Sequence, residues 1–140
     1  MITAKNTSKI PVFILGAVLV LFLAGCATTA PPVKTECKAK IEWQIAPEGE
    51  ISEFKCEMGT YEKEAAVIIT AGVKNISDKP LRYRLNVFLL DMDKAAGSLI
   101  PAKGKPPVLE PGKAITVKLP FPKTDNLSKE ILVVLKTIEL

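Results

Sequence analysis

The chain has 140 residues, of which 48% are hydrophobic and 24% charged, and its 19 basic and 15 acidic residues give a net charge of +4. This length suits one ordinary domain. The basic residues are interspersed and the chain has only one Trp and two Tyr, so a nucleic-acid-binding surface of clustered cations and stacking aromatics is not expected.

The N-terminal segment has the pattern of a signal peptide. Residues 1–9 contain Lys5 and Lys9 and no acid, and residues 10–25 form an uncharged, mainly apolar stretch of 16 residues. This stretch is shorter than the ~20 residues that a transmembrane helix needs, so a permanent membrane span is the weaker interpretation. We therefore predict that residues 1–25 are a cleaved signal peptide. Their removal would leave 17 basic and 15 acidic residues.

The end of this stretch, Leu23-Ala24-Gly25-Cys26, resembles the lipobox of bacterial lipoproteins at all four positions. In that family the thiol is joined to diacylglycerol, the chain is cut before the cysteine, and the new amino group is often acylated. The resemblance implies that Cys26 is the lipidated residue and that Leu23, Ala24 and Gly25 are recognised by the signal peptidase. A cysteine at the end of an ordinary apolar helix is the alternative.

The residues after Cys26 predict a location and a tether. By resemblance to Gram-negative sorting, where Asp at the next position retains a lipoprotein at the inner membrane, Ala27 implies the outer membrane, facing the periplasm, if the host is Gram-negative. Residues 26–36 contain Pro31-Pro32, which excludes a regular helix or central strand. We expect a flexible tether whose last ten residues reach up to roughly 35 Å, followed by one domain over residues 37–140.

Cys37 and Cys56 are the other two cysteines. An even pair in an oxidising compartment favours a disulfide, which would contribute roughly 3 kcal/mol by closing a loop of about 20 residues. Two buried free thiols are the main alternative, and a metal or redox role is a third. Alternation places both thiols on inward faces of predicted strands. Cys37 shares its face with Ala39, Ile41, Trp43 and Ile45. Cys56 shares its face with Phe54 and Met58.

Period-two alternation continues along the chain and predicts strands. A strand from Cys37 to Ile45, a turn over residues 46–49 and a strand over residues 53–58 predict a hairpin. The run over residues 62–74 and the run over residues 81–91 predict two further core strands, separated by turn-forming residues 75–80. The residues expected to point inward are Val67, Ile69, Ala71, Val73, Leu81, Tyr83, Leu85, Val87 and Leu89.

The other face of the strand over residues 81–91 changes from Arg82, Arg84 and Asn86 to Phe88 and Leu90. The apolar end indicates either cover from a neighbouring loop, which we favour, or a small exposed patch. The two arginines, joined by Lys74 or Lys118, could form a basic strip for an acidic partner or anionic headgroups. Charges that guard a strand against edge pairing are the more common arrangement. Arg82, Arg84 and Phe88 are the candidate partner-binding residues.

The C-terminal part alternates less regularly. Residues 92–113 have loop composition, with room for one short strand near Leu99-Ile100. Residues 115–119 predict a strand that Pro120-Phe121-Pro122 stops, and residues 131–140 predict a strand paired inside a sheet. The complete pattern predicts an all-β fold of two packed antiparallel sheets with about seven strands, of the immunoglobulin type.

Two segments carry a second resemblance, over roughly residues 62–120. The turn over residues 73–81 and the Pro-Gly turn over residues 109–113 resemble those of small immunoglobulin-like or fibronectin-type-III-like bacterial envelope domains, including FxLYD-type domains. In such domains an Asn-x-Ser-x-x-x-Leu turn joins two core strands. The resemblance implies a small immunoglobulin-like domain of an envelope protein.

Catalytic chemistry is not predicted. The chain has no His, which removes the usual general base for Ser or Cys nucleophiles and the common zinc sites. Asp91 and Asp93 lack the Gly and Glu of a calcium loop. We expect no enzyme and no cofactor, but a lipid-anchored protein that binds or scaffolds an envelope protein. The alternatives are a small-ligand or metal-handling lipoprotein using Cys37, Cys56, Asp91 or Asp93, and a carboxylate-dependent enzyme. Acidic candidates for the enzyme are Glu48, Glu50, Glu53, Glu57, Glu62, Glu64, Asp91 and Asp93.

Overall fold

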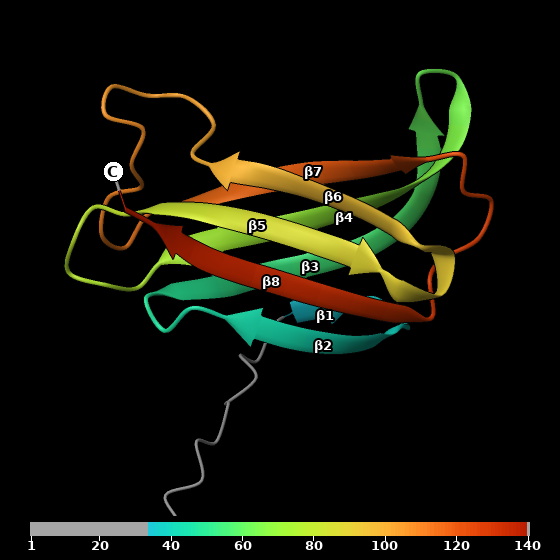
Figure 1. The fold of residues 1–140 in the computed structure, drawn as a ribbon, viewed down its shortest axis with the longest axis horizontal. Coiled ribbons are helices and arrows are strands. Elements are labelled where there is room, and N and C mark those ends of the chain that lie inside the picture. Colours follow the sequence, from blue (N-terminus) through green and yellow to red (C-terminus); the bar gives the residue numbers. More distant parts are fainter. Residues whose placement is uncertain (1–33, 140) are drawn as a thin grey trace, which may run out of the picture.

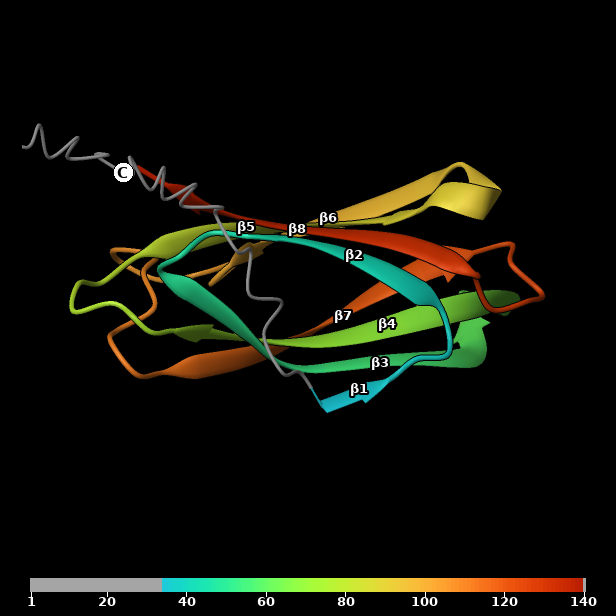
Figure 2. The same cartoon turned by 90° about the horizontal axis from the view of Figure 1, so that it is seen from below.

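The computed structural model describes residues 34–139 and shows an all-β sandwich of two four-stranded sheets (Figures 1 and 2). The predicted signal peptide, the lipobox Leu23–Cys26 and most of the predicted tether lie outside the described residues. Within residues 34–139, no helix is long and apolar enough to cross a membrane.

The strand order, which the sequence pattern left open, is β1-β3-β4-β7 in one sheet, called sheet I, and β2-β8-β5-β6 in the other, sheet II. A single turn of 3-10 helix, η1 (Leu90–Met92), follows β5. The strands are β1 (Lys34–Glu36), β2 (Lys40–Ile45), β3 (Gly49–Tyr61), β4 (Glu64–Asn75), β5 (Arg82–Leu89), β6 (Lys94–Ile100), β7 (Ala114–Pro122) and β8 (Glu130–Ile138).

The predicted pairing is wrong at the first two predicted strands. β2 and β3 do not form a hairpin, because the turn after Ile45 carries the chain from sheet II to sheet I. β2 instead pairs with β8, and β1 pairs with β3, and both pairs are parallel. The sheets are therefore mixed rather than purely antiparallel, and they hold eight strands rather than about seven. Alternation fixes which face a residue occupies but leaves the partner strand undetermined.

Two later strands are longer than the sequence predicts. The sequence predicts a short strand near Leu99 and Ile100, whereas β6 already begins at Lys94. β7 continues through Pro120 to Pro122, opposite Ile68 and Ala66 of β4. Both prolines are tolerated because β7 is an edge strand, where a missing N–H does not interrupt a ladder on both sides.

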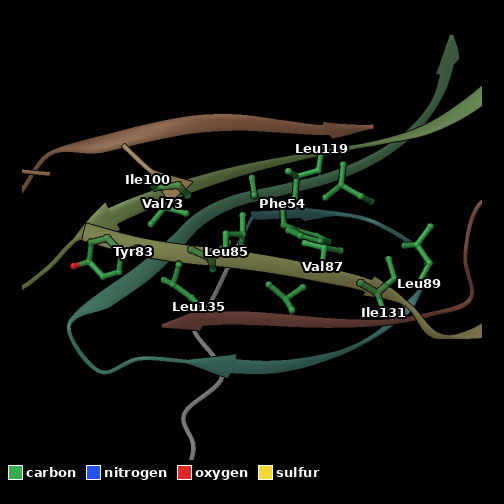
Figure 3. Packing of buried hydrophobic residues seen from close by; sticks show 14 of the residues in the cluster. Phe54, Val73, Tyr83, Leu85, Val87, Leu89, Ile100, Leu119, Ile131 and Leu135 are labelled. Carbon is green, nitrogen blue, oxygen red and sulfur yellow. The ribbon is translucent and has the colours of Figure 1, made fainter. Parts of the chain in front are cut away.

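The core lies between the sheets (Figure 3) and confirms the predicted inward faces. Phe54 of β3 and Trp43 of β2 meet across the sandwich in an edge-to-face contact, with ring centroids 5.1 Å apart. Met58 is the exception, because 42% of its surface is exposed where β3 and β4 extend towards their connecting turn. Fully buried members include Phe54, Val67, Ile69, Ala71, Val73, Tyr83, Leu85, Val87, Leu89 and Val133.

Tyr83 closes one end of this core. Its ring is buried, and its hydroxyl donates a hydrogen bond of 2.8 Å to the backbone oxygen of Glu48, in the turn between β2 and β3. Burial, together with the negative charge of Glu48, raises the pKa of Tyr83 to about 12. Tyr83 therefore remains a neutral hydrogen-bond donor at physiological pH, linking β5 to the turn that joins the sheets.

Candidate functional site

The outer face of sheet II carries a cluster of three cations on its two central strands. Arg84 of β5 lies directly opposite Lys136 of β8, and Arg82 lies two residues along β5 on the same face. Like charges directly opposite each other on neighbouring strands are destabilising. We call Arg82, Arg84 and Lys136 the basic cluster.

No carboxylate among residues 34–139 forms an ion pair with a member of the basic cluster. Neither Arg84 nor Lys136 makes an ion pair within these residues, and both side chains are exposed. Arg82 is half-buried, and its Nε donates a 3.4 Å hydrogen bond to the backbone oxygen of Pro101 at the end of β6. The three positive charges on this face thus make no ion pair among these residues, although Glu48, Asp78 and Glu139 line the hollow beside Arg82, and Glu42 and Glu48 line the groove beside Lys136. Unpaired cations suit the binding of an acidic group.

Only part of this cluster was predicted. β5 lies between β8 and β6, so the interpretation of Arg82 and Arg84 as charges guarding a sheet edge is wrong. Lys74 and Lys118 lie on β4 and β7 of sheet I and do not join the arginines. Lys136 does, because β8 pairs with β5. The signal for it was weak, since Lys136 is the first polar residue to interrupt the apolar run of the last strand.

An apolar area adjoins the basic cluster on the same face. Phe88 of β5 lies between Leu132 of β8 and Ala95 of β6 and is half-buried. Leu90 of η1, just beyond it, is 47% exposed. The predicted cover by a loop is therefore wrong at Leu90. The face presents apolar side chains at one end and cations at the other, and it brings the candidates Arg82, Arg84 and Phe88 together.

Each residue of the basic cluster lines a shallow hollow on the surface. Arg82 lines a hollow of about 490 Å³ at the end of the sandwich, beside Asp78 and Ile138. Lys136 lines an open groove of about 790 Å³ along β2 and β8, and Arg84 lines a smaller one of about 250 Å³.

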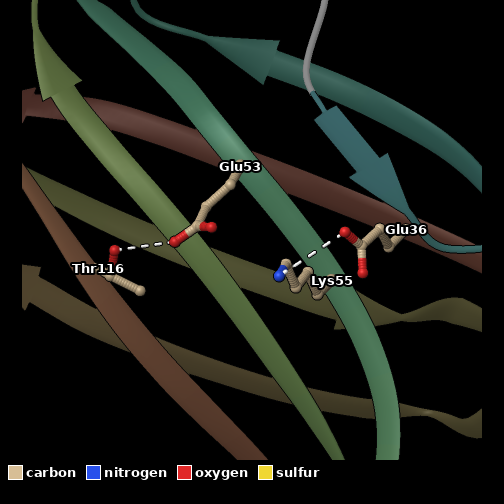
Figure 4. A network of polar contacts seen from close by, with 4 residues as sticks. All are labelled: Glu36, Glu53, Lys55 and Thr116. Atoms are coloured by element: carbon tan, nitrogen blue, oxygen red, sulfur yellow. Dashed lines mark hydrogen bonds and ion pairs between the residues drawn. The ribbon is translucent and has the colours of Figure 1, made fainter.

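Two polar contacts engage charged side chains on the outer face of sheet I (Figure 4). Lys55 of β3 lies 3.7 Å from the Glu36 carboxylate of β1, and the Thr116 hydroxyl of β7 donates a 2.9 Å hydrogen bond to Glu53 of β3. These contacts join the edge strands β1 and β7 to β3. The side chains of Glu36, Glu53 and Lys55 therefore have partners within sheet I. Lys74 and Lys118 on this face also make no ion pair, but Lys74 lies opposite Glu50 and Lys118 opposite Thr70, whereas Arg84 of sheet II lies opposite another cation.

Three of the four residues proposed for a ligand or metal site make contacts within the fold, and the fourth, Asp93, is exposed. Cys37 and Cys56 form a disulfide, with Cα atoms 5.1 Å apart. Asp91 accepts hydrogen bonds from the Ser128 hydroxyl and from the backbone N–H of Lys129, the latter at 2.9 Å. Residues 34–139 contain no group of three or more His, Cys, Asp or Glu side chains that could hold a metal ion.

Asp91 makes stability depend on pH. The hydrogen bonds from Ser128 and Lys129 lower the pKa of its carboxyl group below the ordinary value of 3.8. Its contribution to the free energy of unfolding is therefore complete above the pKa of the unfolded chain and is lost as the pH falls through the folded pKa. We expect Asp91→Asn to be less stable than the wild type at neutral pH. The difference should shrink on acidification, as measured by urea unfolding down to about pH 2. A difference that does not change with pH contradicts this assignment, and Asp125→Asn, at an exposed position, is the control.

Comparison with known proteins gives no match to a family model, a curated protein or a solved structure. The functional argument for this chain therefore depends on its own residues and on the register of its strands.

Proposed function

We propose that the protein is a lipid-anchored, non-enzymatic component of the bacterial cell envelope, and that its β-sandwich binds an acidic segment of another envelope protein through the outer face of sheet II. The observation that carries the binding proposal is the direct opposition of Arg84 and Lys136 without a carboxylate partner. Retaining such a pair costs stability, and an acidic partner would neutralise it. Phe88 and the apolar residues beside it would supply contact area.

The anchor rests on the lipobox. If Cys26 carries the lipid, Cys26→Ser eliminates fatty-acid attachment completely, because the oxygen of serine does not replace the thiol that forms the thioether. Metabolic labelling of the full chain with an alkyne fatty acid measures this. Ala27→Ser, which adds the same hydroxyl group one residue later, should label as the wild type does. A label that persists in Cys26→Ser would place the lipid elsewhere or show that this assignment is wrong.

The binding surface is tested by crosslinking in cells. A photo-crosslinking amino acid at Phe88 is expected to capture a reproducible envelope protein, whereas the same amino acid at Lys118, on the outer face of sheet I, should not. Combining the Phe88 probe with Arg84→Glu and Lys136→Glu should lower the captured amount by about tenfold, because two attractive charges become repulsive.

Three outcomes oppose the binding proposal. Equal capture from Phe88 and Lys118 would mean that the surface is not selective. Capture that the charge reversals leave unchanged would mean that the partner does not use the basic cluster. Crosslinks to lipid alone would assign the cluster to anionic headgroups instead of an acidic protein segment.

A further inference from the structure

The four sheet edges differ in how they are protected. An edge strand exposes unpaired N–H and C=O groups, and proteins usually block such edges with short strands, proline or charge. In sheet I, β1 has three residues, and β7 contains Pro120 and Pro122. In sheet II, β2 carries Lys40 and Glu42. β6, the remaining edge, has seven residues, no proline and one charged residue, Lys94.

The charge of Lys94 does not protect the edge. Its Nζ atom donates hydrogen bonds to the backbone oxygens of Pro122 and Lys123, the latter at 2.9 Å, and so holds the end of sheet I. The rest of β6, from Ala95 to Ile100, is uncharged. β6 also packs close to β7 of sheet I, but no ladder joins these two strands, so the edge of β6 has no strand partner, no proline and no free charge along it. An edge of this kind can accept another strand.

The sequence of β6 is complementary to itself. When two copies pair in antiparallel orientation about Gly97, Ala95 of each copy lies opposite Leu99 of the other, so that a small side chain meets a large one. Ala96 lies opposite Ser98, and the two glycines face each other. Every residue from Lys94 to Ile100 then has a partner in the other copy. Because paired residues lie on the same face, the outer face of sheet II in one copy continues into the outer face of sheet II in the other.

The charges at the two ends of β6 also complement each other in this arrangement. Exposed Asp93 precedes the strand, whereas exposed Lys103 and Lys105 follow it. An antiparallel twofold pairing places the acidic start of each strand beside the basic end of the other.

We propose that two copies of the chain associate through β6, in antiparallel register about Gly97, to form a continuous eight-stranded sheet. The inference goes beyond the proposed function and does not depend on it, because it uses the edge of sheet II rather than its outer face. β6 lies across the molecule from β1, where the described chain begins (Figure 1), so the pairing leaves that side free.

Register-specific disulfide formation tests this proposal in the full chain. Ala95→Cys combined with Leu99→Cys places thiols directly opposite each other in two copies, at a Cα separation of about 5 Å that a disulfide can bridge. Mild oxidation of cells is expected to give a reducible dimer of the double variant at twice the monomer mass.

The two single variants are the matched controls. In the proposed register, the thiol of one copy would lie about 13 Å along the strand from the identical thiol of the other, too far for a disulfide. The dimer band should therefore be lost in each single variant. Equal bands in the single and double variants, no dimer in the double variant, or a disulfide to a different protein would each overturn the proposal.

The end charges provide a second measurement. Within the double-cysteine variant, Asp93→Lys should lower the dimer yield by about twofold to fivefold, the effect of losing exposed ion pairs. Adding Lys103→Glu and Lys105→Glu to the same chain should restore it. A yield that none of these charge changes affects contradicts the proposed orientation.

Discussion

Replacing Asn75 by alanine is expected to lower the free energy of unfolding by about 3 kcal/mol. The side chain is fully buried where β4 ends. Its Nδ2 donates hydrogen bonds to the backbone oxygens of Lys79 at 2.7 Å and Leu109 at 2.8 Å. Its Oδ1 accepts hydrogen bonds from the backbone N–H and the hydroxyl of Ser77. One amide thus holds the turn between β4 and β5 against the loop before β7.

The size of this effect follows from the four hydrogen bonds that the Asn75 amide makes and that alanine would remove together. Each hydrogen bond contributes about 0.5–1.5 kcal/mol net. The Leu109 carbonyl would keep the backbone N–H of Leu81, and the exposed Lys79 carbonyl would keep the Ser77 hydroxyl, so the loss comes from the removed hydrogen bonds and not from orphaned carbonyls. Asn75→Asp keeps the acceptor for Ser77 but removes both N–H donors, so it should lose a comparable amount. Equilibrium urea unfolding measures both changes.

The control for Asn75 is Asn126→Ala, since Asn126 is exposed in the loop before β8 and its replacement should change stability by less than about 0.5 kcal/mol. An Asn75→Ala variant as stable as Asn126→Ala would show that the buried amide does not connect the two loops. The sequence predicts a turn beginning at Asn75, but not the hydrogen bond to Leu109, because that residue is 34 positions away.

The faces of the strands were predictable because they depend on local alternation. The predicted inward sides are correct for β4, from Val67 to Val73, and for β5 together with the residue before it, from Leu81 to Leu89. The partners were not predictable in the same way, since β2 pairs with β8 at the other end of the chain. Nothing near Lys40–Ile45 specifies that choice, which depends on how the two sheets pack.

The same distinction applies to the candidate surface. Arg82, Arg84 and Phe88 were placed on one face because they alternate with buried residues in a single strand. The addition of Lys136 required knowing that β8 pairs with β5. The extent of β6 was missed because Ala95, Ala96 and Gly97 favour strands weakly. The prediction of lipidation at Cys26 stays a prediction, since that residue precedes the described part of the chain.

Replacing Cys37 and Cys56 together by alanine is expected to lower the free energy of unfolding by about 3 kcal/mol in the chain-entropy model. The disulfide closes a loop between residues 19 positions apart. Cys37 lies in the connection between β1 of sheet I and β2 of sheet II, and Cys56 lies in β3. The bond therefore ties the crossing point of the chain to sheet I.

Urea unfolding with and without a reductant separates the cross-link from the packing of the sulfur atoms. Reduction of the wild type should reproduce most of the loss, because both thiols remain in place beside the core. The double alanine variant should be insensitive to reductant and somewhat less stable than the reduced wild type, since it also loses two half-buried side-chain groups. Equal stability of the oxidised and reduced wild type would contradict the expected contribution. In that case the Trp43–Phe54 contact and the pairing of β2 with β8 would suffice to hold the N-terminal strands in place.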